Sequence, residues 1–586
     1  MSSRGGKWRW TASFAILLFF IFSIAWQTRA AAEQSLAEQL LEIMRANHQI
    51  SEAQYKKLKK QAEEQKAAQM RTEKEYKKLK NQVEKQQATA EDRQIQTETR
   101  YAELKKQVDK QNAAQAIMAG QTATPKTKAA SGKKISANNQ LRETGTGTGG
   151  GGMSFHMHGI KVNIGGFIEA AGIYRNRWLG ADVDSPFQNL PLRNSPHYYQ
   201  NETRFTARQS RLSIMAQGDY SPTVHLTGYY EMDFLGAAPS ANSNESNSYN
   251  MRIRHLFALV HWETYGLRLL CGQTWSLVTL DSKGIIPLAE EIPLTIDAQY
   301  VPGFNWARQP QFRIVKDWNK KFWLGLSVEN PQTTYSSEPD APANFPVNYS
   351  LNQAPGSLFA SNLSVNNMPD IVEKAAYDCR FGHFELFNLT RTFNSSLEVG
   401  SGPKSLNSQN ITGDAVGGGF IIPLYGQKLT LQTSGMYGDG IGRYGSGQLP
   451  DVTQDANGAI HPIPAFHLLS GLIWSPSKAF TMYSYFGMEQ AQRKYYTANG
   501  VAYGYGNPLY DTYVYGLGVP GAFQGQIQSI AQITVGEWWN FYHGNYGNMV
   551  WGLQYSYTTD NYFSGSHPGP QANDSMFFSS FRYYWN

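Results

Sequence analysis

Beyond its first quarter, the chain is built from short segments in which hydrophobic and polar residues alternate. The last of them, residues 575–586, carries Phe577, Phe581, Tyr583 and Trp585 at alternate positions. Side chains two residues apart share one face of a strand, so this segment has one aromatic face. Aromatic strand faces that meet lipid and headgroups are typical of transmembrane β-barrels, whose closed sheets leave no free edge.

Sixteen segments of this kind can be recognised. They are residues 165–175, 206–217, 223–234, 250–261, 267–276, 308–316, 321–329, 371–380, 383–391, 412–422, 428–438, 465–474, 479–491, 527–538, 548–558 and 574–584. Every second connection is short, as expected for the periplasmic turns of an outer-membrane barrel, and the others are long, as expected for its outer loops. The sequence therefore predicts an all-β transmembrane barrel of about 16 antiparallel strands. We place it in residues 157–586 and expect the last strand to pair with the first.

Residues 32–118 follow a helical pattern instead. The unit Tyr-x-x-Leu-x-x-x-Ala/Val-x-x-Gln begins at Tyr55, Tyr76 and Tyr101, and spacings of three and four mark one face of a helix. Such a polar amphipathic helix is expected to self-associate, which predicts an N-terminal α-helical coiled coil, a stalk on the periplasmic side. The alternative is a solvated or partly disordered charged tail.

The remaining N-terminal segments are a predicted leader and a predicted linker. Basic Arg4, Lys7 and Arg9 precede an apolar run and then small alanines, which indicates a signal peptide over residues 1–31. A retained membrane anchor is the alternative, but it needs about 20 apolar residues and this run is shorter. Residues 119–156 have no apolar periodicity and include a Gly/Thr tract, which indicates a flexible linker.

Charge and cysteine content exclude several classes of function. The formal net charge is +6, but residues 153–586 hold 26 basic and 31 acidic residues, so the basic pI does not indicate nucleic-acid binding. Two cysteines are too few for a disulfide framework or a zinc site. No spacing of Ser, His and Asp singles out a catalytic triad, and we expect no catalytic residues, no metal and no cofactor.

Charged residues alternate with apolar ones in several predicted strands, which places them on the water-lined inner face. An arginine-lined wall lowers the barrier for anions. Acidic residues lie on the neighbouring strand, so the alternative is a neutralised salt-bridge network that stiffens the wall. The predicted pore-lining residues from this alternation are Arg211, Arg252, Arg254, Arg313, Glu231 and Asp233.

The third long connection, residues 277–307, is unusually apolar for an outer loop. It also holds Asp281, Glu290, Glu291 and Asp297. Because Pro, Ile and Leu are poorly suited to bulk water, we expect this loop to fold into the lumen and narrow the pore opposite the arginines. An ordinary extracellular loop is the alternative.

Five stretches together resemble one family. They are RQSRLSIMAQGDY from Arg208, YYEMDFLG from Tyr229, RIRHLFALVHW from Arg252, CGQTWS from Cys271 and RQPQFRI from Arg308. Their order and spacing resemble the DcaP-like porins of Gram-negative outer membranes. The resemblance implies a homotrimer of sixteen-stranded barrels, an N-terminal periplasmic coiled coil, and passive uptake of small anions such as dicarboxylates. Arg308 lies in a matching segment and joins the predicted pore-lining residues.

The sequence therefore predicts a porin in the Gram-negative outer membrane, surrounded by lipid, that passes small hydrophilic and mainly anionic solutes. An envelope tether is the alternative, in which the coiled coil contacts the cell wall and the barrel serves as an anchor. An outer-membrane hydrolase is a third, weaker hypothesis.

Overall fold

The computed structural model describes the barrel part of the chain. The described residues are 153–157, 159–236, 250–336, 364, 366–399, 405–455, 459–498, 500–510, 513–514, 522–523, 525–563 and 569–585, with Lys56, Lys59 and Lys60. The predicted signal peptide, almost all of the predicted coiled coil and the linker up to residue 152 lie outside them. Among the described residues, no helix is both long and apolar enough to cross a membrane.

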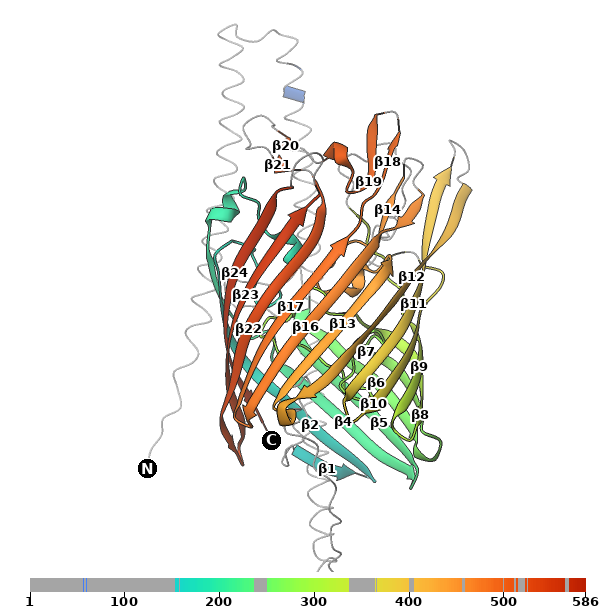
Figure 1. Ribbon diagram of the computed structural model, residues 1–586, viewed down its shortest axis with the longest axis vertical. Helices are drawn as coiled ribbons and strands as arrows, with labels where there is room; N and C mark the ends of the chain where they lie inside the picture. Colours follow the sequence, from blue (N-terminus) through green and yellow to red (C-terminus); the bar gives the residue numbers. More distant parts are fainter. Residues whose placement is uncertain are drawn as a thin grey trace, which may run out of the picture. The chain divides into compact units, whose positions relative to one another are not determined.

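One antiparallel sheet of eighteen strands makes up the body of the molecule (Figure 1). Its strands are β1 (Met153–Met157), β2 (Ile160–Arg175), β3 (Glu202–Thr206), β4 (Arg211–Ser221), β5 (Val224–Gly236), β6 (Asn250–Trp262), β7 (Leu267–Trp275), β8 (Arg308–Trp318), β9 (Phe322–Glu329), β10 (Asp370–Cys379), β11 (Gly382–Val399), β12 (Ser405–Leu424), β13 (Leu429–Asp439), β16 (Pro464–Ser477), β17 (Phe480–Ala491), β22 (Ile527–Gly544), β23 (Gly547–Tyr562) and β24 (Gln571–Tyr584).

The connections between the barrel strands contain small two-stranded sheets and single turns of 3₁₀ helix. The small sheets join β14 (Val452–Gln454) to β15 (Ile460–Pro462), β18 (Lys494–Ala498) to β19 (Val501–Tyr505), and β20 (Tyr513–Val514) to β21 (Ala522–Phe523). The 3₁₀ turns are η2 (Phe187–Asn189), η3 (Pro196–Tyr199), η4 (Glu263–Tyr265), η6 (Tyr425–Gln427), η7 (Gly442–Tyr444) and η8 (Pro508–Tyr510).

The main sheet closes on itself. Strands β1 and β3 pair only with β2, and the other sixteen pair in chain order until β24 returns to β2. In this seam Ile168 lies opposite Tyr583 and Arg175 opposite Met576. The predicted sixteen-stranded barrel and its closure by the last strand are confirmed.

Several strand boundaries differ from the predicted ones. The segment predicted as 206–217 contains the end of β3 and the first part of β4, which continues to Ser221. Strands β11 and β12 extend further along the chain than alternation indicated. The last residues of the predicted linker form β1, which pairs with the start of β2 as a hairpin.

Turns at one end of the barrel are short, and connections at the other end are long. The β8–β9 turn is an example, because Asn319 and Lys320 both have a φ of 55°. Two central residues with positive φ give a turn whose twist matches that of the strands it joins. The start of β2 and the end of β24 lie at this short-turn end, as an even number of strands requires.

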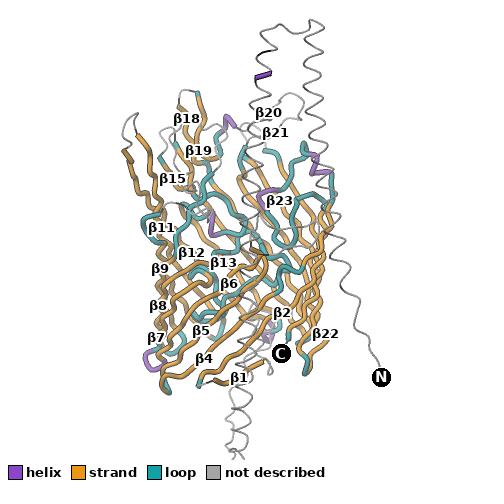
Figure 2. Tube along the Cα trace, turned by 180° about the vertical axis from the view of Figure 1, so that it is seen from behind, coloured by secondary structure: helices purple, strands orange, loops and turns teal. Residues whose placement is uncertain are grey.

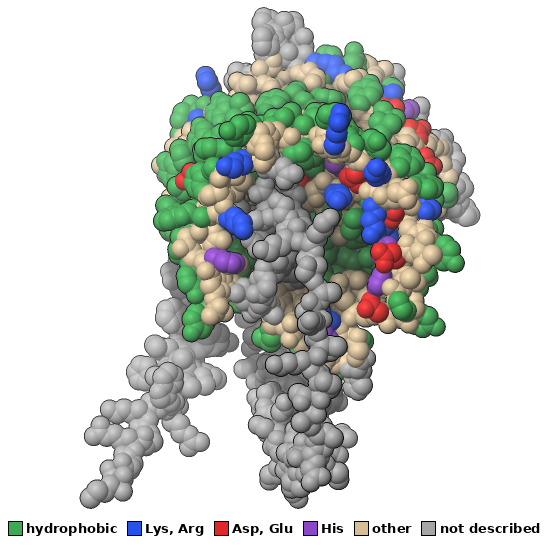
Figure 3. All heavy atoms as spheres, turned by 60° about the horizontal axis from the view of Figure 1, so that its bottom comes forward, with side chains coloured by type: hydrophobic (Ala, Val, Ile, Leu, Met, Phe, Trp, Pro, Cys, Tyr) green, Lys and Arg blue, Asp and Glu red, His purple; other side chains and the backbone are tan. Residues whose placement is uncertain are grey.

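The two faces of each strand differ in burial. Along β9, Leu324, Leu326 and Val328 are exposed, while Gly325 and Ser327 between them are buried. The exposed set points away from the barrel, so the outside is apolar. Figure 3 looks at the short-turn end, where hydrophobic side chains form an outer margin and charged and histidine side chains lie around the opening.

A buried ion pair lies on the inner side of the seam. Arg582 Nε donates to Glu169 Oε1 at 2.9 Å, and Arg582 Nη2 donates to Gln209 Oε1 at 2.7 Å. The Ser580 hydroxyl donates to the same Glu169 oxygen. The first and last barrel strands are therefore joined by side chains as well as by backbone hydrogen bonds.

Replacing Glu169 by glutamine is expected to weaken this seam. The buried Arg582 guanidinium would lose its carboxylate, and removing one partner of a buried pair costs about 3 kcal/mol. Urea unfolding in detergent should show that loss for Glu169→Gln. It should not do so for Glu373→Gln, which changes an exposed carboxylate on β10. Equal stability of the two variants would contradict the role of the seam pair.

Candidate functional site

The connection between β7 and β8, residues 276–307, lies inside the barrel and is almost entirely buried. Figure 2 shows loop segments running through the barrel interior. Near its start, Leu277 and Ile285 belong to a buried cluster with Trp323 of β9 and Phe387 of β11. Further along, Leu294 belongs to a second buried cluster with wall residues from β17, β22 and β24. This inserted loop therefore packs against two different parts of the wall.

The first part of the inserted loop is held by a charged cluster on β10 and β11. Lys374 Nζ donates to Asp281 Oδ2 at 2.8 Å and to the Thr279 carbonyl at 2.7 Å, and it lies 2.8 Å from Glu385 Oε1. Glu385 also accepts a hydrogen bond from the Asp281 amide at 3.2 Å. All these side chains are buried, so the contacts act with little competition from water.

Strand β11 extends this cluster through a histidine. His383 Nε2 lies 3.1 Å from Glu385 Oε2, and His383 Nδ1 lies 2.9 Å from Asp378 Oδ1. Asp378 also accepts from the Gly284 amide at 3.3 Å. The wall thus contacts the loop at three successive points between residues 279 and 284.

The far part of the loop is held by uncharged donors and acceptors on β17, β22 and β23. The Tyr485 hydroxyl oxygen accepts a hydrogen bond from the Leu294 amide at 3.1 Å. The Trp538 indole N–H donates to the Leu294 carbonyl at 2.8 Å, and Gln554 accepts from the Ile296 amide. Buried backbone groups of the loop therefore find partners on the wall, as burial requires.

Glu489 of β17 joins the inserted loop to a second loop. Its Oε1 atom accepts from the Gly303 amide at 2.8 Å and from the Gly447 amide at 2.7 Å. A Cβ at Gly303, where φ is +88°, would lie 2.0 Å from the Leu468 carbonyl oxygen, and one at Gly487 would lie 1.9 Å from that of Pro302. Glycine at both positions lets the loop backbone lie directly on the wall.

The predicted acidic residues of the loop have different surroundings. Asp281 pairs with Lys374, and a backbone bridge joins residue 281 to Glu290. Asp297 Oδ1 accepts from the amides of Ser185 at 3.3 Å and Gln299 at 3.0 Å. Glu290 and Glu291 are buried as well. The four acidic residues thus have different partners along the loop.

The predicted arginine wall is a network of paired charges. Arg252 Nη2 donates to Asp233 Oδ2 at 2.8 Å, and Arg254 contacts Glu231 at 2.6 Å and Asp233 at 3.1 Å. Arg211 Nη1 lies 3.8 Å from Glu231 Oε1. Both carboxylates are almost fully buried, so β4, β5 and β6 share one continuous salt-bridge network.

The two arginines of β8 lie beside an aromatic side chain. Arg313 Nη2 donates to the Trp275 carbonyl at 2.5 Å, and Arg313 Nε donates to Gln311 Oε1 at 2.9 Å. The Arg308 guanidinium stacks on the Trp275 ring, 4.6 Å from its centroid. Trp275 thus links the predicted arginines of β8 to the base of the inserted loop.

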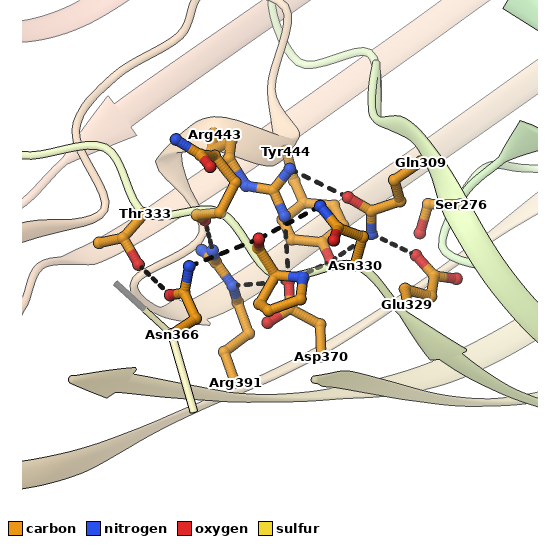
Figure 4. A network of polar contacts seen from close by, with 12 residues as sticks. Ser276, Gln309, Glu329, Asn330, Thr333, Asn366, Asp370, Arg391, Arg443 and Tyr444 are labelled. Carbon is orange, nitrogen blue, oxygen red and sulfur yellow. Dashed lines mark hydrogen bonds and ion pairs between the residues drawn. The ribbon is translucent and has the colours of Figure 1, made fainter. Parts of the chain in front are cut away.

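Sequence reasoning missed a second buried network, shown in Figure 4. Asp370 Oδ2 accepts from Tyr444 Oη at 2.8 Å, Arg443 Nη2 at 3.0 Å and Arg391 Nε at 3.2 Å. Arg391 Nη1 also lies 2.8 Å from Asp451 Oδ1. Alternation within residues 383–391 could have placed Arg391 on the inner face, but nothing local indicates its partner in a loop about sixty residues away.

The described residues show no metal centre. Among them, no group of three or more His, Cys, Asp or Glu side chains could hold a metal ion. Cys271 and Cys379 are free thiols, both half-buried. The inner wall and the inserted loop present fixed charges and hydrogen-bonding groups.

Comparison with known proteins supports a fold assignment. No protein-family model and no curated protein matches the chain. The outer membrane channel DcaP of Acinetobacter baumannii is 16% identical with a TM-score of 0.51, covering 74% of this chain and 99% of that one. The anion-selective porin from Comamonas acidovorans is 12% identical with a TM-score of 0.40, covering 73% and 100%. Salmonella typhi OmpF is 9% identical with a TM-score of 0.39, covering 74% and 100%. The similarity to the DcaP channel shows that this chain has a porin-like fold.

The loop carboxyl Asp297 makes the stability of the protein depend on pH. Burial raises its pKa from 3.8 to about 6, although Arg175 and the two amide donors oppose the shift. Because folding raises this pKa, the contribution of Asp297 to stability is fully present below the unfolded value and is lost as the pH rises through about 6.

The Asp297→Asn variant should remove this pH dependence while keeping an acceptor oxygen for the two amides. The free energy of unfolding of the wild type should fall relative to that of the variant by about 2 to 3 kcal/mol between pH ~4 and pH ~7. Urea unfolding of both proteins across that range measures the difference. A difference independent of pH would contradict the burial of an ionisable carboxyl at this position.

Proposed function

We propose that this protein is a porin of the Gram-negative outer membrane, through which small hydrophilic solutes diffuse passively. The observation that carries the proposal is the closed sixteen-stranded barrel with an apolar outer face, crossed inside by an inserted loop that both sides of the wall hold. An apolar outer face suits a lipid bilayer, and a closed sheet satisfies every backbone group within it. No chemical step and no energy input are involved.

In this proposal the inserted loop narrows the pore. Its acidic residues, Asp281, Glu290, Glu291 and Asp297, belong to the constriction. Anchors at Lys374 on one side and at Glu489 on the other fix the loop across the lumen. Because the loop is fixed at both sides, it cannot move away from the lumen as a unit. The largest solute that can pass through the pore therefore stays the same.

We further propose a preference for anions such as dicarboxylates. On this part of the wall five arginines lie with two carboxylates, an excess of three positive charges that does not include the four acidic residues of the inserted loop. These residues are Arg211, Arg252, Arg254, Arg308, Arg313, Glu231 and Asp233. Among the arginines that pair with Glu231 or Asp233, Arg252 is the most accessible, with 22% of its side chain exposed. A guanidinium that faces water can bind a carboxylate in passing, and an excess of fixed positive charge lowers the barrier for anions.

The wider assembly belongs to the same proposal. We infer a homotrimer in outer-membrane lipid, with residues 32–118 forming a periplasmic coiled coil that is available for contact with the cell wall. The leader, almost all of the stalk and most of the linker lie outside the described residues, so these parts rest on the sequence pattern and the family resemblance.

Reversal potentials in planar bilayers test the function. Under a salt gradient, the wild type should conduct with an anion-selective reversal potential, and Arg252→Gln should shift that potential toward cations because the exposed guanidinium is lost. Arg380→Gln, which changes an exposed arginine in the short β10–β11 turn, should leave it unchanged.

The outcomes separate the hypotheses. Conductance with a cation preference that ignores Arg252 would retain a porin and reject the selectivity mechanism. Absence of conductance in correctly folded protein would contradict the porin and favour the tether, in which the barrel is an anchor.

A further inference from the structure

A hollow of about 590 Å³ lies on the outward face of the barrel, over β17, β22, β23, β24, β2 and β3. Its sides are exposed apolar residues, among them Met482, Val535 and Phe577. It lies where the small residues Gly172 and Ser579 are surrounded by larger apolar and aromatic side chains. A Cβ at Gly172 would lie 3.1 Å from the Phe205 ring, so a larger residue at this position would occupy part of the hollow.

One carboxylate lines this hollow. Glu537 of β22 lies directly opposite Met482 of β17 and Leu553 of β23, and both of these residues also line it. No described residue forms an ion pair or a hydrogen bond with the Glu537 side chain. An ionisable side chain on a lipid-facing surface is costly. Glu537 differs from the outward Glu373 of β10 because it borders an apolar hollow, so a ligand with both a positive charge and an apolar chain fits this position.

The level of Glu537 along the barrel favours a headgroup. Two residues further toward the short-turn end, Trp539 is exposed on the same face, and Phe541, Trp551 and Phe581 join it as exposed aromatic residues. Aromatic belts of this kind mark the interface between lipid and water. Glu537 lies two residues from this belt, on the side away from the short-turn end. Its carboxylate can therefore pair with a headgroup at the belt, while an acyl chain lies in the apolar hollow beside it.

We propose that this hollow, lined by Glu537, is a binding site for a phospholipid with a primary ammonium headgroup, such as phosphatidylethanolamine. The ammonium group pairs with the Glu537 carboxylate, and one acyl chain lies against Met482, Val535 and Phe577. This inference rests on the membrane location in the proposed function. A second barrel is a poorer occupant, because its wall is convex and would bring apolar side chains to the carboxylate.

Native mass spectrometry of the full-length protein tests the site. The protein is exchanged into detergent with equal amounts of phosphatidylethanolamine and phosphatidylglycerol that carry identical acyl chains. The wild type should retain the ethanolamine lipid about tenfold better, as expected for a charge-assisted hydrogen bond in a partly desolvated site. Glu537→Gln should lose that preference. Glu373→Gln, which changes an outward carboxylate on β10 outside the hollow, should keep it.

A second variant tests the hollow itself. Ser579→Leu fills the floor with an apolar side chain, so it should reduce retention of both lipids and is compatible with the outward face. Equal retention of the two lipids by the wild type, or a preference unchanged in Glu537→Gln, would overturn the proposal. So would loss of oligomers in Glu537→Gln without a change in lipid retention, because the carboxylate would then serve a contact between copies.

Conductance measured on the same preparations separates this inference from the porin function. Wild type and Glu537→Gln should conduct alike, since Glu537 faces away from the lumen. A protein that conducts but shows no lipid preference retains the porin and loses the lipid site.

Discussion

In the membrane location proposed above, the structure depends on one constraint, which is that no backbone N–H or C=O can be left without a partner inside a bilayer. A sheet meets it only by closing, and here β24 closes the sheet by pairing with β2. Closure then fixes the two faces of every strand. The outer face is apolar, while the inner face is free to carry charge, and Glu169 and Arg582 use that freedom to join the first strand to the last.

The same requirement applies to the inserted loop, which has no sheet of its own. Its backbone groups are buried, so the wall must supply their partners, and it does so with side chains from both sides. Asp378 and Glu385 accept from loop amides on one side, and Tyr485, Gln554 and Glu489 do so on the other. The polar inner wall thus has two roles, because it lines the interior and also replaces the water that the loop backbone has lost.

The sequence predicted the barrel well because alternation is a local property. The alternation within each strand indicates its inner and outer faces, and the length of each connection indicates the end of the barrel at which it lies. The anchors were not predictable in the same way. Lys374 can be placed on an inner face from its neighbours, but its contact with Asp281 depends on the path of a loop that ends far from it in the chain. Alternation indicates which side of the wall a residue faces, but it does not indicate which residue of the inserted loop it contacts.

The central claim is that the inserted loop, held at both sides, sets the width of the pore. Single-channel conductance of a variant lacking residues 285–296 tests it most directly, since that deletion removes the part of the loop between the two anchors. The variant should conduct clearly more than the wild type, with the barrel still folded. An unchanged conductance in a folded barrel would contradict the central claim.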